Sequence, residues 1–204
     1  ESESRGLGDV YKRQDLSGST LKAEARRGSA VIDFTKATLA HADLSDSKLN
    51  AGGYWYATID FEEANLDHAD LSGSKVTAGK KAGGATSATI DFKKANLANA
   101  DLSRSELKAD GLEAIIEFRG ANLTHADLSG SDLYAYSETY DATVDFTKAN
   151  LLSADLSGSL LTAVSRTGDT TIDFSEANLI NADLSGAGLI SKSGKRALPE
   201  DAGD

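Results

Sequence analysis

Apolar residues recur along most of this chain at intervals of five residues, as in Phe61, Leu66, Leu71 and Val76. An α-helix repeats its inward direction every 3.6 residues and a simple strand every two residues. A spacing of five instead indicates a chain that turns a corner after each short strand, so that successive strands form the sides of a coil. The pattern therefore predicts an all-β fold, a parallel β-helix or solenoid in which stacked coils enclose one core.

Six such blocks follow one another, and each begins at a Phe. The spacing from one Phe to the next is 27, 31, 26, 28 and 28 residues, a period typical of stacked repeat proteins. A seventh, incomplete block occupies residues 15–21. We therefore expect about six to seven coils of about 28 residues each. The complete blocks begin at Phe34, Phe61, Phe92, Phe118, Phe146 and Phe174.

Four units of five residues do not fill one block, so each coil contains an additional segment before the next Phe. The flanks of this segment alternate apolar and polar residues, as at Leu49 and Ala51 and again at Ala57, Ile59 and Phe61. Such alternation is typical of a strand with one buried face. We expect two lengthened strands leaving one corner of the coil, joined by a protruding, hairpin-like loop. The predicted loops span residues 52–56, 79–86, 110–113, 136–141 and 164–169.

The five-residue unit is nearly constant: Ala, then Asp or Asn, then Leu, then two variable residues, as in residues 64–66 and 69–71. It resembles the unit of the pentapeptide-repeat family over about residues 15–190. The resemblance implies a right-handed, quadrilateral β-helix with four five-residue faces per coil. It also implies that the Leu or Phe and the small residue two positions earlier point inward, while the Asp or Asn points outward. The additional segment in each coil is a departure from the plain family pattern.

The two ends of the chain do not carry the repeat. Residues 1–14, ESESRGLGDVYKRQ, switch abruptly to the repeat at Asp15, and they look like a translated sequencing-adapter segment that is not native to the protein. We set this segment aside from the fold argument. Residues 191–204 are polar, with little to bury, and are expected to form a tail. The solenoid is thus assigned to residues 15–190.

Composition narrows the class of protein without identifying a role. Hydrophobic residues make up 40% of the 204 residues, and no apolar run approaches the ~20 residues that a membrane span needs. The net charge of −11 opposes direct binding to nucleic acid. The chain contains no Cys, which suits both oxidising and reducing compartments, so the sequence assigns no localisation.

Stacking brings equivalent acidic residues into two columns along the solenoid. Carboxylates about 5 Å apart repel by nearly 1 kcal/mol per pair in a water-like dielectric. Two hypotheses explain how the columns are stabilised. In the favoured one, each carboxylate accepts hydrogen bonds from backbone N–H groups or hydroxyls at the next corner, such as Ser72 and Ser74; in the other, cations such as Ca²⁺ bridge the carboxylates. The columns are Asp33, Asp60, Asp91, Glu117, Asp145 and Asp173, and Asp43, Asp70, Asp101, Asp127, Asp155 and Asp183.

No pattern in the sequence indicates catalysis. His41, His68 and His125 occupy one equivalent position, where we favour a solvated polar corner over a metal site, because no further ligand recurs at a fixed offset. No Ser lies in a nucleophile-elbow motif, and no Gly-rich loop could cradle a phosphate. The sequence therefore predicts a protein that is not an enzyme, with no catalytic residues, no cofactor and no metal.

Aromatic residues concentrate in the additional segments. Large aromatics at loop tips are favoured contact residues at interfaces, and we expect these side chains to bind a partner, Trp55 above all. The alternative is that some fold back and cover an apolar edge of the neighbouring coil. The candidates are Tyr54, Trp55, Tyr56, Tyr134, Tyr136 and Tyr140.

Two functions are compatible with these observations. The favoured one is a structural or interaction scaffold, a rod that presents variable loops to a protein or glycan partner and can also associate end to end with other solenoids. The alternative rests on the resemblance, which implies an acidic mimic of duplex DNA that binds a type II topoisomerase such as gyrase. The net charge and the carboxylate columns support this alternative, whereas loops in every coil would roughen the mimicking surface.

Overall fold

The structure is a computed structural model that describes residues 14–79 and 87–194. Residues 1–13 and 195–204 lie outside the described residues, so the predicted foreign segment and most of the predicted polar tail are not part of the description below. The predicted loop at 79–86 is described only at Gly79.

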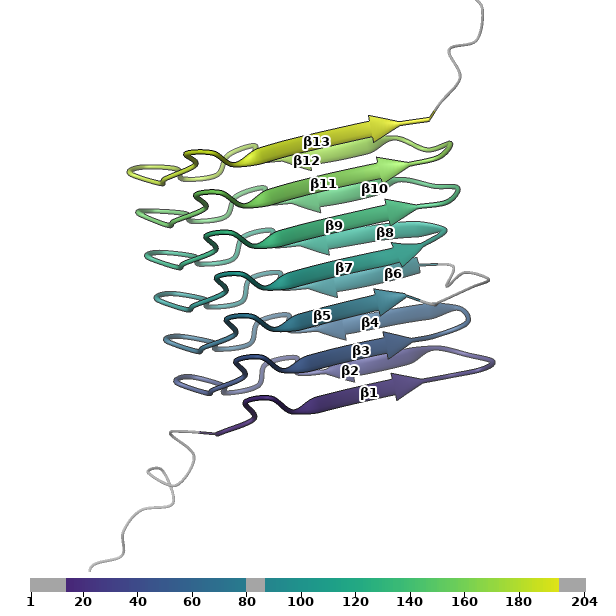
Figure 1. The fold of residues 1–204 in the computed structure, drawn as a ribbon, viewed down its shortest axis with the longest axis horizontal. Helices are drawn as coiled ribbons and strands as arrows, with labels where there is room; N and C mark the ends of the chain where they lie inside the picture. The colour runs from purple at the N-terminus through teal and green to yellow at the C-terminus, as the bar shows by residue number, and fades with distance from the viewer. Residues whose placement is uncertain (1–13, 80–86, 195–204) are drawn as a thin grey trace, which may run out of the picture.

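Thirteen parallel strands form two facing sheets, and no helix occurs among the described residues. Odd-numbered strands make a seven-stranded sheet and even-numbered strands a six-stranded one. The chain alternates between the sheets, so each coil contributes one strand to each (Figure 1). This confirms the predicted parallel solenoid. The strands are β1 (Thr20–Glu24), β2 (Ala30–Asp33), β3 (Lys48–Gly52), β4 (Tyr56–Asp60), β5 (Lys75–Gly79), β6 (Ser87–Asp91), β7 (Glu106–Gly111), β8 (Glu113–Glu117), β9 (Asp132–Ser137), β10 (Ala142–Asp145), β11 (Leu160–Ser165), β12 (Thr170–Asp173) and β13 (Gly188–Ser193).

The five-residue units form the corners between an even strand and the next odd strand. Between β4 and β5 the chain makes three tight turns, and the short segments between them carry isolated parallel bridges at Asn65 and Asp70. In Figure 1 these corners line the left edge of the stack, and the turns that join odd to even strands line the right edge. The coil is therefore oblong, with two long sides and two short ones.

Each corner requires one residue with a left-handed backbone. Glu63 and His68 have φ values of 57° and 56°, and Gly73 has 63°. Only Gly adopts this region without cost, and a non-glycine residue there costs roughly 1–2 kcal/mol. The turns are closed by backbone hydrogen bonds; Ala64 N donates to the Phe61 carbonyl oxygen at 3.0 Å. Because the corners recur in register, each is also held by the coils on either side.

The core is a stack of aromatic rings flanked by aliphatic columns. Neighbouring Phe rings lie 4.7 to 4.9 Å apart between centroids and are nearly parallel. The four inner Phe residues are fully buried, and so are the Leu residues of the two corner columns in the inner coils, whereas Leu179 in the last coil is 37% exposed. Small Ala residues, such as Ala64 and Ala69, fill the positions two before each Leu. The predicted inward positions are thus confirmed.

The additional segments extend the two sheets. In β3, Leu49 and Ala51 are buried between exposed or half-buried neighbours, and in β4 Ala57 and Ile59 alternate in the same way. This alternation follows the prediction, but the connections are shorter than the predicted loops because the strands take up most of the segment. Residues 53–55 alone join β3 to β4, and Leu112 alone joins β7 to β8.

Replacing Phe118 by Ala is expected to lower the free energy of unfolding by about 3–5 kcal/mol, because it opens a cavity in the stacked core. Phe118 is fully buried, with Phe92 on one side and Phe146 on the other. The shift of the urea unfolding midpoint measures this loss. Thr171→Ala, at an exposed position of β12, serves as the control and should change stability by less than about 0.5 kcal/mol. Equal effects of the two substitutions would contradict the assigned core.

Candidate functional site

Three exposed aromatic residues cluster at the turn between β3 and β4. Tyr54, Trp55 and Tyr56 are 46%, 55% and 54% exposed. The backbone of this turn is fixed on both sides, because Tyr54 N and Trp55 N donate to the Gly28 carbonyl oxygen at 2.8 and 3.1 Å, and Ser87 N donates to the Trp55 carbonyl oxygen at 3.1 Å. The aromatic side chains therefore project from a turn that is held by the coils on both sides.

A fourth exposed aromatic residue lies on the same edge of the stack. Tyr140 is 54% exposed in the turn between β9 and β10. Its carbonyl oxygen accepts hydrogen bonds from the hydroxyls of Ser137 and Ser165, at 2.6 and 2.7 Å. Three coils separate this turn from Trp55, which corresponds to about 14 Å along the stack at the usual strand spacing. We call Tyr54, Trp55, Tyr56 and Tyr140 the aromatic edge.

The remaining two candidates lie elsewhere. Tyr134 and Tyr136 are half-buried residues of β9 on the outer face of the seven-stranded sheet, not at a loop tip as expected. Their rings are nearly parallel, with centroids 6.3 Å apart, and Lys108 Nζ lies 5.7 Å from the centroid of the Tyr134 ring. Partial burial raises the pKa of the Tyr134 phenol. The structure therefore divides the six candidates between two surfaces.

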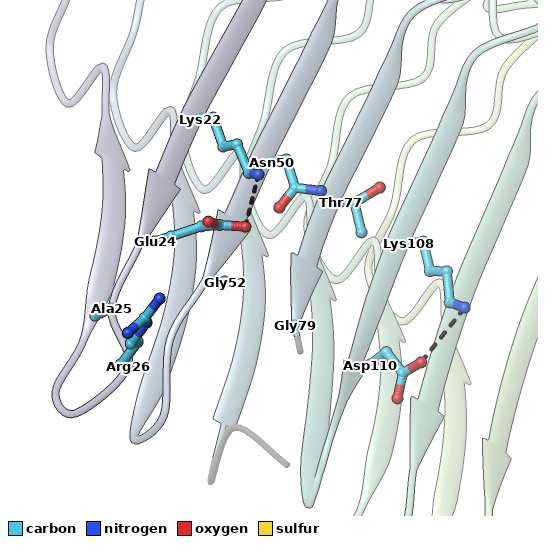
Figure 2. Close-up of a pocket in the computed structure, with 10 residues that line it drawn as sticks. All are labelled: Lys22, Glu24, Ala25, Arg26, Asn50, Gly52, Thr77, Gly79, Lys108 and Asp110. Carbon is cyan, nitrogen blue, oxygen red and sulfur yellow. Dashed lines mark ion pairs between the residues drawn. The ribbon is translucent and has the colours of Figure 1, made fainter. Parts of the chain in front are cut away.

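Beside these tyrosines the same sheet face is hollowed into a groove that sequence reasoning missed. Figure 2 shows four neighbouring strands that present two rows of residues. One row contains Lys22, Asn50, Thr77 and Lys108, and the other contains Glu24, Gly52, Gly79 and Asp110. The groove has a volume of about 500 Å³. We call it the glycine groove, because Gly52 and Gly79 place no side chain between Glu24 and Asp110.

The acidic columns are stabilised by hydrogen bonds at the following corner. Asp70 Oδ1 accepts from Ser72 N at 2.9 Å, and Asp43 Oδ1 accepts from both the N–H and the hydroxyl of Ser45, at 3.0 and 2.7 Å. This supports the favoured hypothesis for Ser72. The expectation for Ser74 was wrong, because its hydroxyl is buried without a hydrogen-bond partner. Four further hydroxyls share this environment, those of Ser47, Ser105, Ser131 and Ser159.

In the first acidic column, hydrogen bonds only partly offset the cost of burying charged carboxylates next to one another. Burial raises the pKa of Asp91; a hydrogen bond from Lys93 N opposes the rise, and the carboxylates of Asp60 and Glu62 add to it. Burial, followed by the charge of Asp91, likewise raises the pKa of Glu117. These carboxylates are therefore less stable in the charged form in the folded protein than in water.

Arg119 stabilises the charged form of Asp145, the next carboxylate of this column. The Asp145 side chain is only 7% exposed, and Arg119 Nη2 lies 2.8 Å from its Oδ2. Burial alone would raise the pKa of Asp145, but hydrogen bonds from Thr147 and Arg119 outweigh it, and the pKa is lowered. Arg119 Nε also lies 3.4 Å from Glu117 Oε1. One guanidinium thus bridges two stacked carboxylates.

The histidines occupy left-handed corner positions. The rings of His41 and His68 are neighbours, with centroids 4.9 Å apart and planes inclined by 30°, and His68 Nδ1 lies 2.9 Å from Asp67 Oδ1. Across residues 14–79 and 87–194, no group of three or more His, Cys, Asp or Glu side chains is placed to hold a metal ion. The described part of the chain also contains no helix able to cross a lipid bilayer.

Comparison with known proteins agrees with this architecture. A family model described as pentapeptide repeats (8 copies) matches residues 116–134 and 172–189. The two matched segments carry pentapeptide repeats, in agreement with the resemblance found in the sequence. No curated protein matches the chain.

Several solved structures are similar to the chain at low sequence identity. The pentapeptide-repeat protein Rfr23 from the cyanobacterium Cyanothece 51142 is 17% identical, with 89% of each chain covered and a TM-score of 0.25. HetL from Nostoc sp. strain PCC 7120, involved in heterocyst differentiation regulation, is 21% identical, with 89% of this chain and 87% of HetL covered and a TM-score of 0.17. Full-length QnrB1, a plasmid-mediated fluoroquinolone resistance protein, is 17% identical, with 84% of this chain and 93% of QnrB1 covered and a TM-score of 0.25.

Replacing Asp91 by Asn is expected to stabilise the protein at neutral pH. The amide keeps an oxygen that can accept from Lys93 N and removes the charge that burial and the neighbouring carboxylates disfavour. Because the folded-state pKa is raised, the carboxylate is unfavourable above that pKa, and its effect disappears as the pH falls toward the unfolded value of 3.8. The gain in urea midpoint should therefore shrink on acidification.

Asp183→Asn is the matched control for this prediction. Asp183 is exposed, and hydrogen bonds from Ser185 lower its pKa, so its carboxylate stabilises the folded state above the unfolded pKa. Its replacement should lower the urea midpoint at neutral pH, with the loss fading as the pH falls. If both substitutions shifted the midpoint in the same direction, the electrostatics assigned to the two acidic columns would be wrong.

Proposed function

We propose that this protein is a non-enzymatic interaction scaffold whose aromatic edge binds a protein partner. The observation that carries the proposal is a cluster of three large and exposed aromatic side chains, Tyr54 and Trp55 on a turn with a fixed backbone and Tyr56 at the start of β4. Tyr and Trp are the residues most enriched among energetically dominant interface contacts. The other exposed large hydrophobic side chains among the described residues, apart from Tyr140, are aliphatic: Val31, Leu160, Leu179, Ile180 and Leu189.

The fixed turn favours binding because it loses little conformational entropy on association. Immobilising a flexible loop on association costs conformational entropy, whereas this turn already donates and accepts backbone hydrogen bonds with the coils on either side. Aromatic side chains add contact area with few rotatable bonds. A solenoid of stacked coils supplies a rigid support, since each coil is held by its neighbours.

Photo-crosslinking tests this proposal directly. A benzoylphenylalanine placed at position 55 should capture a specific protein in a lysate of the organism that expresses the chain, and the same probe at exposed Thr171 should not. The captured protein is then purified, and its affinity is measured for the wild-type chain and for Trp55→Ala. We expect a loss of about thirtyfold, the size of an interface hot spot of about 2 kcal/mol.

The single Trp of the chain gives an independent measurement. Binding at the aromatic edge should shift the emission of Trp55 to shorter wavelength, because the indole leaves water. A purified partner that binds equally well to Trp55→Ala, or without any change in emission, would contradict the proposal.

A second candidate function is the acidic mimic of duplex DNA that binds a type II topoisomerase such as gyrase. The net charge of −11 and the two carboxylate columns along the stack favour it. Three features weigh against it: many of these carboxylates bind their own corner N–H groups, Asp145 is buried, and Lys93 and Arg119 lie beside the column. We therefore favour the scaffold.

The gyrase supercoiling assay separates the two functions. An excess of the purified protein at low salt should leave supercoiling unchanged if the scaffold proposal is right. Inhibition that weakens as salt is added would support the mimic, because exposed charges are screened at high ionic strength.

End-to-end association is a further element of the scaffold proposal. Leu189 is 53% exposed, whereas its equivalents in the two preceding coils, Leu161 and Leu133, are buried. Apolar contact through Leu189 would join this coil to the end of another solenoid.

A further inference from the structure

The glycine groove is a second surface of the molecule, separate from the aromatic edge. It crosses β1, β3, β5 and β7 on the outer face of the seven-stranded sheet. At the usual spacing of parallel strands, the outermost of these strands lie about 14 Å apart. The groove therefore follows the axis of the stack and is long enough for an extended ligand rather than a compact one.

The floor of the groove comes from two glycines in equivalent positions of consecutive coils. An added Cβ at Gly52 would lie 3.6 Å from the Gly79 carbonyl oxygen and 3.7 Å from Glu24 Cγ, which are ordinary contacts. Gly79 differs, because its φ of 136° excludes other residues and an added Cβ would collide with the backbone of Asp110. Only Gly79 is thus required by the backbone, and local strain does not explain the glycine at position 52.

The two ends of the groove are formed by internal ion pairs. Lys22 Nζ lies 2.8 Å from Glu24 Oε1 at one end, and Lys108 Nζ lies 3.3 Å from Asp110 Oδ2 at the other. Figure 2 shows the two pairs on opposite sides of Gly52 and Gly79. Within the two rows each charge has a partner of opposite sign, so a charged ligand there would have to compete with an existing ion pair. Arg26, on the turn after β1, also lines the groove (Figure 2) and adds one cation at that end.

Each of these groups still has free hydrogen-bonding capacity. An ammonium group carries three donors and a carboxylate about four acceptor sites, and one ion pair uses only part of this capacity. Asn50, between the two ends, adds amide donors and an acceptor, and Thr77 adds a hydroxyl. Over its two rows the groove therefore offers alternating donors and acceptors with balanced charge, and only Arg26 at the β1 end adds an unbalanced cation.

We propose that the glycine groove binds a neutral, linear oligosaccharide laid along the stack. A polyhydroxylated ligand can both donate to carboxylates and accept from ammonium groups while the ion pairs stay intact. An apolar ligand would instead bury these polar groups without hydrogen bonds, at a high cost. The length of the groove, its polar walls and its side-chain-free floor all match such a chain.

The tyrosine pair extends the groove at one end. Tyr134 and Tyr136 follow Lys108 and Asp110 in the next strand of the sheet, in the same two rows. Aromatic rings with an apolar face and a polar hydroxyl provide contacts for ligands that are amphipathic in the same way. A sugar chain that leaves the groove over β7 would meet these rings next.

The test is a titration of the whole chain with neutral tetrasaccharides, namely cellotetraose, maltotetraose and chitotetraose, followed by calorimetry and by the amide resonances of Gly52 and Gly79. At least one of these probes should bind and shift both resonances. Gly52→Gln places a side chain on the floor without backbone strain and should abolish binding. Asn50→Ala should weaken binding by about tenfold, equivalent to one lost hydrogen bond.

Thr171→Gln, on the exposed face of the other sheet, is the matched control and should bind like the wild-type chain. Tetragalacturonate and a heparin tetrasaccharide are the charged comparison probes. Absence of binding by all three neutral probes, binding by charged probes alone, or binding that survives Gly52→Gln would each overturn the proposal. These outcomes are independent of the aromatic edge, because Trp55 does not line the groove.

Discussion

The parallel register between coils is the constraint on which the rest of the structure depends. Equivalent backbone groups of successive coils are hydrogen-bonded along the corners as well as in the sheets; Leu66 N donates to the Asn96 carbonyl oxygen, and Leu97 N donates to that of Asn122. A slip of one residue would turn every inward side chain outward. The register is kept although the coils differ in length, because the turns between the two sheets absorb the difference.

Register makes each position of the repeat meet copies of itself. For residues with compatible self-contacts this is favourable: the Phe rings stack, and the Asn side chains form a ladder in which Asn96 Nδ2 donates to Asn65 Oδ1 at 3.1 Å. For carboxylates it is unfavourable, and the chain offsets the repulsion with hydrogen bonds from the corners and with Arg119. The same geometry therefore produces both the stability of the core and the raised pKa of Asp91.

Much of the fold could be predicted from the sequence because five-residue spacing has few structural causes. The inward columns, the oblong coil and the corner hydrogen bonds of the Asp residues all follow from local patterns. The placement of Tyr134 and Tyr136 was wrong because they were assigned to a loop. Leu133 and Ala135 alternate with these tyrosines and point inward, and this pattern would have placed both tyrosines on a strand.

The glycine groove was harder to predict, since no single segment contains it. It depends on which outward positions of four coils lie beside one another, and the unequal coil lengths hide that alignment. Gly52 and Gly79 looked like loop residues because glycine is common in turns. Their shared position became visible only from the strand register. In that register they occupy the same row as Glu24 and Asp110 and form the floor of the groove.

Among the residues that the structure describes, the turns between the sheets range from the single residue Leu112 to residues 25–29, while the buried columns on either side stay in line. Sequence changes in these turns therefore leave the buried columns undisturbed. One such connection can be lengthened, shortened or replaced without changing the buried columns, and only its hydrogen bonds to the neighbouring turns are affected. The turns can thus diversify one coil at a time while the core of the solenoid is kept.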